Sequence, residues 1–334
     1  MKILNITNGD GAANIIKQST VVGDVLPWRD PMHHGPFPSK LSLAELGKLR
    51  AAYLAGPDAD PTEIERDFQL RDQHLRASEN YDKITLWFEH DLLDQLQILQ
   101  ILDWFSGPRT QGAILDMICI DRFPGKSRFR GIGELSPEEM ASLTELRQPV
   151  TDNMLAIATS GWAAFRSNDP RDLLAFLNHD LSELPFLTAA LRRHIEEFPD
   201  ASTGLNRTER QLLGLMADGV HAPQQLFLQN MEMETTLFIG DWPTYRTLDS
   251  LCASGLAACN PPPFRFPSYS REKHAAFNMQ HLSITEAGCR VLNGMRDAFD
   301  LMQRDGWLGG VNVVEFGAIW TWDKETAEFL RRAI

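Results

Sequence analysis

The chain has 334 residues, of which 43% are hydrophobic and 23% are charged, and its formal net charge is −13. This length exceeds what one compact core usually spans, and the composition is too apolar for a disordered chain, so we expect more than one folded domain. Because the negative charge repels phosphate backbones and anionic lipid surfaces, generic binding to nucleic acids or membranes is disfavoured unless a local basic patch overrides it.

The start of the chain and the cysteines indicate a cytoplasmic protein. Residues 1–10 lack the basic region, long apolar core and cleavage site of a secretory signal. No apolar run approaches the roughly 20 residues of a membrane span. No two cysteines have C-x-x-C spacing, which favours buried free thiols in a reducing cytosol over a zinc site; they are Cys119, Cys252, Cys259 and Cys289.

Predicted strands and helices alternate over the first 135 residues. The strands are expected at residues 3–7, 21–28, 84–88 and 114–120, and the helices at 12–19, 43–54, 61–79 and 92–105. Asn8 or Asp10 is expected to cap the first helix. The alternation predicts an α/β domain over residues 1–135 with an open, mostly parallel, Rossmann-like sheet.

The pattern becomes mainly helical from residue 136. Ser136, Pro137 and Glu139 form a Ser-x-x-Glu capping box with proline in the first turn. Further helices are expected at 151–166, 170–179 and 185–198. We therefore predict a helical region over residues 136–200, packed on the α/β domain and ended by the polar linker 200–204.

Residues 205–302 have a different order of predicted helices and strands, which predicts a winged-helix-like domain. Three helices are expected at 208–217, 223–230 and 241–255, followed by a ribbon of 256–259 with 281–285 and a closing helix over 286–302. Residues 303–334 are expected to form an ordered C-terminal extension because three tryptophans lie there: Trp307, Trp320 and Trp322.

The predicted recognition helix is poorly suited to DNA. Residues 241–249 hold one arginine and two aspartates, whereas base reading needs Arg, Lys, Asn or Gln. Residues 205–294 carry eight acidic residues against seven basic ones. We therefore expect packing or protein contact, with phosphate contact left open only at the predicted wing tip: Arg265, Arg271, Lys273 and His274.

Polar side chains follow every predicted strand of the α/β domain. They lie in four segments: residues 8–11, residues 30–35, residues 89–95 and residues 121–122. In an open parallel sheet, ligands bind beyond the carboxyl ends of the strands, where the strand order reverses. We therefore expect these segments to meet at one edge of the sheet.

Four of these residues are candidate acids or bases: Asp30, His34, Glu89 and His90. For Glu89 and Asp91, favourable interaction with the positive end of a helix is the alternative explanation. Metal-ligand spacing such as H-E-x-x-H is absent, so no metal site is predicted.

The ligand-binding candidates are Asn8, Gly9, Asp10, Gly11, Asp94, Gln95, Arg122 and Arg128. The glycine-containing turn before a helix suits an anion, but it is not G-x-G-x-x-G and no Walker lysine follows, so no cofactor is indicated. The basic segment 122–130 is a candidate for holding an anionic group of a small molecule. The alternative is that this segment is a solvated loop.

Three segments resemble the bacterial family known as domain of unknown function 1835. They are Asn-Gly-Asp-Gly-Ala-Ala at 8–13, Trp-Arg-Asp-Pro-Met-His-His-Gly-Pro at 28–36, and Leu-Trp-Phe-Glu-His-Asp-Leu-Leu-Asp-Gln-Leu-Gln at 86–97. Two later segments, 205–213 and Phe-Ile-Gly-Asp at 238–241, resemble the companion domain of unknown function 3658. The resemblance implies a bacterial protein of this arrangement and carries no activity or catalytic residue with it.

Two functions follow as hypotheses. The first is binding of an anionic small molecule at the strand ends, with catalysis left open. The second is a non-enzymatic regulator or adaptor whose winged-helix-like domain contacts a protein or, less favourably, DNA. The sequence leaves open a protein partner or a homo-oligomer.

Overall fold

The computed structural model describes residues 1–56, 60–107, 112–235, 239–266, 271–304 and 306–334. Phe238 of the resembling segment and the side chains of residues 271–274 at the predicted wing tip lie outside this description. The chain divides into two compact units. Unit 1 is Met1–Leu191 with Trp307–Val311, and unit 2 is Arg192–Gly306 with Asn312–Ile334.

Unit 1 is built on a five-stranded sheet in the order β2-β1-β4-β5-β6. Four strands are parallel, and β6 is antiparallel to β5. Their bounds are β1 (Ile3–Thr7), β2 (Asp24–Pro27), β4 (Lys83–Glu89), β5 (Ile114–Ile120) and β6 (Gln148–Pro149). The predicted open, mostly parallel sheet of an α/β fold is therefore confirmed.

The strand β2 is shorter than the predicted 21–28. Gly23 has a φ of 119°, and a Cβ added there would lie 2.5 Å from the carbonyl oxygen of Ile3. Extended backbone therefore begins only after this glycine, at Asp24.

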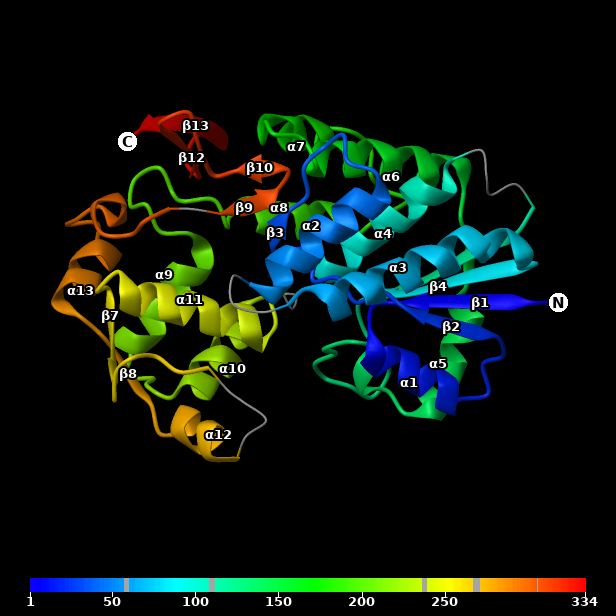
Figure 1. Ribbon diagram of the computed structural model, residues 1–334, viewed down its shortest axis with the longest axis horizontal. Coiled ribbons are helices and arrows are strands. Elements are labelled where there is room, and N and C mark those ends of the chain that lie inside the picture. Colours follow the sequence, from blue (N-terminus) through cyan, green and yellow to red (C-terminus); the bar gives the residue numbers. More distant parts are fainter. Residues whose placement is uncertain (57–59, 108–111, 236–238, 267–270, 305) are drawn as a thin grey trace. The chain divides into compact units, whose positions relative to one another are not determined.

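Helices cover both faces of this sheet (Figure 1). One face carries α1 (Asp10–Gln18) and α5 (Pro137–Ser142), and the other carries α2 (Leu43–Ala55), α3 (Thr62–Arg76), α4 (Leu92–Phe105) and α6 (Asp152–Phe165). On the first face Ile16, Trp87 and Ile118 belong to one buried cluster. The predicted capping box of Ser136 and Glu139 is confirmed at the start of α5.

The other elements of unit 1 are short. They are η1 (Ala77–Asn80), η3 (Ile132–Glu134), η4 (Leu143–Leu146), α7 (Arg171–Phe176) and β3 (Gly35–Pro36), which pairs in parallel with β9 (Trp307–Gly309). The predicted helix 61–79 ends at Arg76 and continues as the tighter helix η1. Two elements run across the division of the chain: α8 (Leu187–Ile195) and β10 (Val311–Asn312).

Unit 2 contains five α-helices over described residues 207–292 and a two-stranded ribbon, which share one core. The elements are α9 (Arg207–Ala217), α10 (Pro223–Met233), α11 (Asp241–Ala253), β7 (Ala257–Asn260), α12 (Arg271–Asn278), β8 (His281–Ile284) and α13 (Glu286–Leu292). The strands β7 and β8 are antiparallel, and Leu212, Leu248 and Leu282 are buried together. The predicted closing helix 286–302 instead stops at Leu292, since Asn293 caps it and Gly294 follows with a φ of 69°. Residues 298–300 form a separate short helix, η5.

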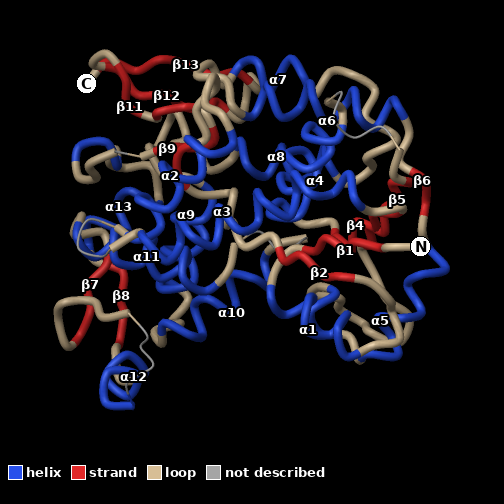
Figure 2. Tube along the Cα trace, turned by 45° about the vertical axis from the view of Figure 1, so that its right-hand side comes forward, coloured by secondary structure: helices blue, strands red, loops and turns tan. Residues whose placement is uncertain are grey.

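The C-terminal extension of unit 2 forms an antiparallel sheet (Figure 2). Its strands are β11 (Val314–Glu315), β12 (Ala318–Asp323) and β13 (Glu328–Ala333). The ring of Phe329 lies 4.8 Å from that of Phe198 and 5.1 Å from that of Trp322, centroid to centroid. These aromatic contacts explain why the expected extension is ordered.

A buried ion pair holds the loop that follows β2. Arg50 Nη2 of α2 lies 2.6 Å from Asp30 Oδ1, and both side chains are almost fully buried. Arg50 also donates to the carbonyl oxygens of Pro31 and His34, and its guanidinium carbon lies 4.3 Å from the centre of the Phe37 ring. The two carbonyl oxygens and the aromatic ring therefore replace the water that the guanidinium of Arg50 loses on burial.

We expect Arg50→Ala to lower the free energy of unfolding by about 3–5 kcal/mol, because Asp30 would be left as an unpaired buried charge. Arg29→Ala is the matched control. Arg29 pairs with Asp10 at the surface, so its loss should cost at most about 1 kcal/mol. Urea unfolding followed by circular dichroism measures both, and equal losses would show that the buried pair does not hold this loop.

Candidate functional site

The strand order of unit 1 reverses between β1 and β4. The chain passes from β1 to β2 on one side and then returns across β1 to β4 on the other. This is the place where open α/β sheets bind ligands, beyond the carboxyl ends of the strands. The residue after β1 is Asn8, and the last residue of β4 is Glu89.

Asn8, Glu89 and Asp94 are hydrogen-bonded to one another at this place, and we call them the Asn8 cluster. Asn8 Nδ2 donates to Glu89 Oε1 and to Asp94 Oδ1, each at 3.0 Å. The backbone N–H of Glu89 donates to Asp94 Oδ2 at 2.6 Å. Glu89 is 4% exposed and Asp94 is 0% exposed, so the structure joins three predicted site residues in a buried network.

The loop before η3 covers this cluster. The backbone N–H of Ile132 donates to Glu89 Oε1 at 2.6 Å. Gly131 has a φ of 141°, and a Cβ added there would lie 2.3 Å from Glu89 Oε2. Neither residue was predicted, because a glycine near a basic segment gives no local signal for contact with a strand 42 residues earlier.

Burial raises the pKa values of the three acids of this region, and that of Glu89 lies above neutral pH. Burial, followed by the charge of Asp91, raises the pKa of Glu89 to about 8. Burial also raises the pKa of Asp91 to about 6 and that of Asp94 well above its usual value. Acids and bases that act near neutral pH need pKa values in this range, so Glu89 is the best placed of the predicted catalytic residues.

The neighbours of Glu89 fix the start of α4. Asp91 Oδ1 accepts a hydrogen bond from the backbone N–H of Asp94 at 2.9 Å, so Asp91 is the N-terminal cap of the helix. Gln95 Nε2 donates to the Glu89 carbonyl oxygen at 2.7 Å. His90 is half-buried, and burial lowers its pKa.

Asp10 does not join the Asn8 cluster. Its carboxylate pairs with Arg29 at 2.9 Å on the exposed surface. The prediction that Asn8 or Asp10 caps the first helix is wrong: Gly9 is the cap residue, without a side-chain hydrogen bond. The amide of Asn8 instead satisfies the two buried carboxyl groups. Gly9 is half-buried and Gly11 is exposed at the same turn.

The loop of residues 30–35, which follows β2 and contains His33 and His34, lies against α2. The carboxylate of Asp30 is held in the buried ion pair with Arg50. His33 is buried and His34 is half-buried, with ring centroids 4.4 Å apart. Gln97 Nε2 of α4 donates to the carbonyl oxygens of Trp28 and Asp30, which ties this loop to the helix that begins at the Asn8 cluster.

The predicted arginines lie on the surface. Arg122 pairs with Asp121 at 2.9 Å, and its side chain is 85% exposed. Arg128 is also exposed. Among the described residues, no group of three or more His, Cys, Asp or Glu side chains is arranged to hold a metal ion.

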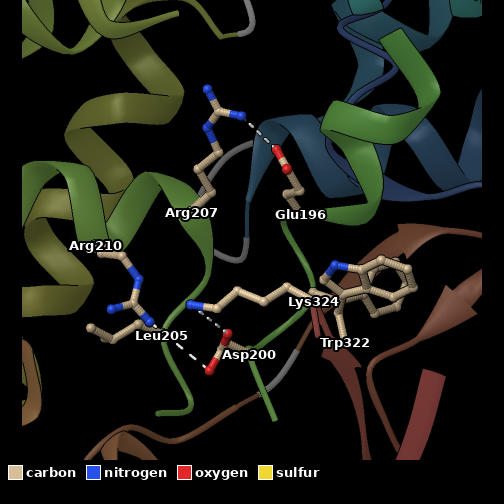
Figure 3. A pocket seen from close by; sticks show the side chains of 8 residues that line it. Glu196, Asp200, Leu205, Arg207, Arg210, Trp322 and Lys324 are labelled. Carbon is tan, nitrogen blue, oxygen red and sulfur yellow. Dashed lines mark hydrogen bonds and ion pairs between the residues drawn. The ribbon is translucent and has the colours of Figure 1, made fainter. Parts of the chain in front are cut away.

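Unit 2 contains a hollow of about 180 Å³ beside its C-terminal sheet (Figure 3). Arg207 lies 2.7 Å from Glu196 and 2.9 Å from Glu234. Arg210 and Lys324 lie 3.9 and 3.7 Å from Asp200. Since each of these cations faces a carboxylate, the hollow is explained by ion pairs within unit 2, and we assign no ligand to it.

No protein-family model matches the chain, and no curated protein sequence is significantly similar to it. The resemblance to the two domains of unknown function therefore stays a prediction. Within the described part of the chain, every helix is too short or too polar to cross a bilayer.

We expect Glu89→Gln to make the stability of the protein less dependent on pH. Folding raises the pKa of Glu89 from 4.5 to about 8, so the folded protein holds the proton of Glu89 more tightly than the unfolded chain does. The stability that this proton adds is fully present below about pH 4.5 and is lost as pH rises through 8. Each unit of difference corresponds to about 1.4 kcal/mol.

Urea unfolding between pH 5 and pH 9 measures this effect. The free energy of unfolding should fall over that range in the wild type and fall less in Glu89→Gln. Glu79→Gln, at an exposed position, is the control and should follow the wild type. Parallel curves for Glu89→Gln and the wild type would mean that Glu89 is ionised in the folded protein.

Proposed function

We propose that this cytosolic protein binds an anionic small molecule at the reversal point of its α/β sheet, with the Asn8 cluster as the floor of the site. The observation that carries the proposal is the hydrogen-bonded meeting of Asn8, Glu89 and Asp94 where β1 and β4 end. Parallel sheets bind ligands at this position.

The charge state of the cluster supports an anionic ligand. With a pKa of about 8, Glu89 is mostly uncharged at neutral pH and does not repel an anion. Arg122 follows β5, whose carboxyl end lies beside that of β4, and its guanidinium pairs with Asp121, so an anionic ligand would compete with Asp121 for it. Arg128 is exposed six residues further along the same basic segment. Arginine forms paired hydrogen bonds with carboxylates and phosphates.

Acid–base catalysis is a further part of this proposal. A protonated Glu89 is suited to donate a proton to a bound molecule and to take it back near neutral pH. His34 and His90 are the further candidates for proton transfer. Asp30 is left out because Arg50 neutralises it.

Ligand-induced thermal stabilisation tests the proposal. Phosphate monoesters and small carboxylates are screened against the purified protein, and we expect a subset to raise the melting temperature. Arg122→Ala together with Arg128→Ala should weaken that effect at least tenfold in ligand concentration, and Glu89→Ala should abolish it. Arg147→Ala, at an exposed arginine beyond α5, is the control. If both site variants respond to the ligands as the wild type does, the site is wrong.

A second proposal concerns unit 2. Helices α9, α10 and α11 with the β7–β8 ribbon support a winged-helix-like adaptor that contacts a protein. Trp242, in the first turn of α11, is 50% exposed, and its ring lies 4.9 Å from that of Phe266. Exposed aromatic side chains favour protein contacts, while Asp241 beside Trp242 disfavours a phosphate backbone.

We expect no binding to duplex DNA at low salt, because α11 begins with an acidic residue and unit 2 has no excess of basic residues over residues 205–294. Fluorescence anisotropy with a labelled random-sequence duplex, from 20 to 200 mM salt, measures this. Binding that weakens steeply as salt rises would favour a transcription-factor function instead.

A further inference from the structure

Unit 1 also contains a hollow. It has a volume of about 210 Å³ and lies between four helices on one face of the sheet. The helices are α2, α3, α4 and α6, which lie on the same side of the sheet in Figure 1. The walls are three tryptophans and four leucines, and the tryptophans are Trp28, Trp104 and Trp162. Its polar lining residues are Gln100, Asp103 and Arg166. Apolar walls with a few polar groups are typical of small-molecule sites.

Gln100 presents unused hydrogen-bond donors in this hollow. Its Oε1 accepts a hydrogen bond from Trp28 Nε1 at 3.1 Å, which fixes the orientation of the amide because the indole N–H is only a donor. Within the described ranges, the amide nitrogen of Gln100 makes no hydrogen bond, although the residue is 5% exposed. A ligand with acceptor oxygens would satisfy this donor.

Arg166 carries a positive charge that lacks a close carboxylate. Its Nε and Nη2 donate to the carbonyl oxygens of Pro38 and Leu41, at distances of 2.7–3.1 Å. Its guanidinium carbon lies 5.4 Å from the centre of the Trp162 ring, which restricts its position. No ion pair of Arg166 is formed with any residue that the structure describes, and its Nη1 has no hydrogen-bond acceptor there.

The third polar residue, Asp103, acts on Arg166 only at longer range. Burial raises the pKa of the Asp103 carboxyl group. The positive charge of Arg166 is therefore only partly compensated by the charge of Asp103, and it lies half-buried in a mostly apolar hollow. Burying a charge without a paired opposite charge is costly, and one bound carboxylate would remove that cost.

We propose that this hollow binds a small apolar molecule that carries one carboxylate. The carboxylate would accept hydrogen bonds from Arg166 Nη1 and Gln100 Nε2, and the apolar body would lie between the tryptophans. The hollow is smaller than the pockets of about 300–1,000 Å³ that take drug-sized ligands, so the molecule is small. An amino group on the same molecule would lie near Asp103, which distinguishes an apolar amino acid from a simple carboxylic acid. This site is separate from the strand-end site proposed above.

Isothermal titration of the full-length protein tests this proposal with three probes: 3-phenylpropanoate, phenylalanine and 3-phenyl-1-propanol. We expect at least one of the two carboxylates to bind saturably and at least tenfold more tightly than the alcohol. Tighter binding of phenylalanine would assign an amino acid, and tighter binding of 3-phenylpropanoate a simple carboxylic acid. No binding of either carboxylate, or equal binding of the alcohol, overturns the proposal.

Two variants locate the binding. Arg166→Gln should weaken carboxylate binding at least tenfold, and Leu43→Trp should abolish it by filling the hollow while leaving Arg166 in place. Arg147→Gln is the matched control, because Arg147 also donates to a backbone carbonyl, that of Thr144, but is exposed. Unchanged binding in Leu43→Trp would overturn the proposal even if Arg166→Gln failed to fold.

Discussion

The hydrogen bonds that the side chain of Asn8 donates to Glu89 and Asp94 are the constraint on which the strand ends of unit 1 depend. Two carboxyl groups buried side by side repel each other when ionised, and each needs hydrogen-bond donors once water is removed. The Asn8 amide and the backbone N–H of Ile132 supply those donors, and protonation removes the repulsion. The ends of β1 and β4, the start of α4 and the loop before η3 are thereby fixed together.

Helix α4 extends this constraint into the rest of unit 1 through three buried glutamines. Gln95 donates to the carbonyl oxygen of Glu89, Gln97 to those of Trp28 and Asp30, and Gln100 accepts from the indole of Trp28. Backbone carbonyls just beyond strand ends have no sheet partner, so these amides satisfy groups that would otherwise be buried without a hydrogen bond. One helix therefore positions both the strand-end site and the hollow between the helices.

The two proposed sites of unit 1 use opposite electrostatic arrangements. At the strand ends, burial raises the pKa values of Glu89 and Asp94, and Arg122 and Arg128 carry positive charge at the surface. In the hollow, Arg166 keeps its charge among aromatic rings without a carboxylate at ion-pair distance. The first arrangement is suited to moving a proton, and the second to holding a fixed anion.

Local chemistry determined much of what the sequence predicted correctly. The alternation of strands and helices, the capping box at Ser136 and the polar residues after β1 and β4 depend on spacing over a few residues. The α/β sheet and the meeting of polar residues at its edge were therefore predictable. Only the tertiary structure decided which polar groups meet. Asn8 bonds residues 81 and 86 positions away instead of capping its own helix, and Arg50 neutralises Asp30. Gly131 and Ile132 close over Glu89. The physical reason is that caps and periodicity act along the chain, whereas burial, pKa and the choice of hydrogen-bond partner depend on which segments packing brings together.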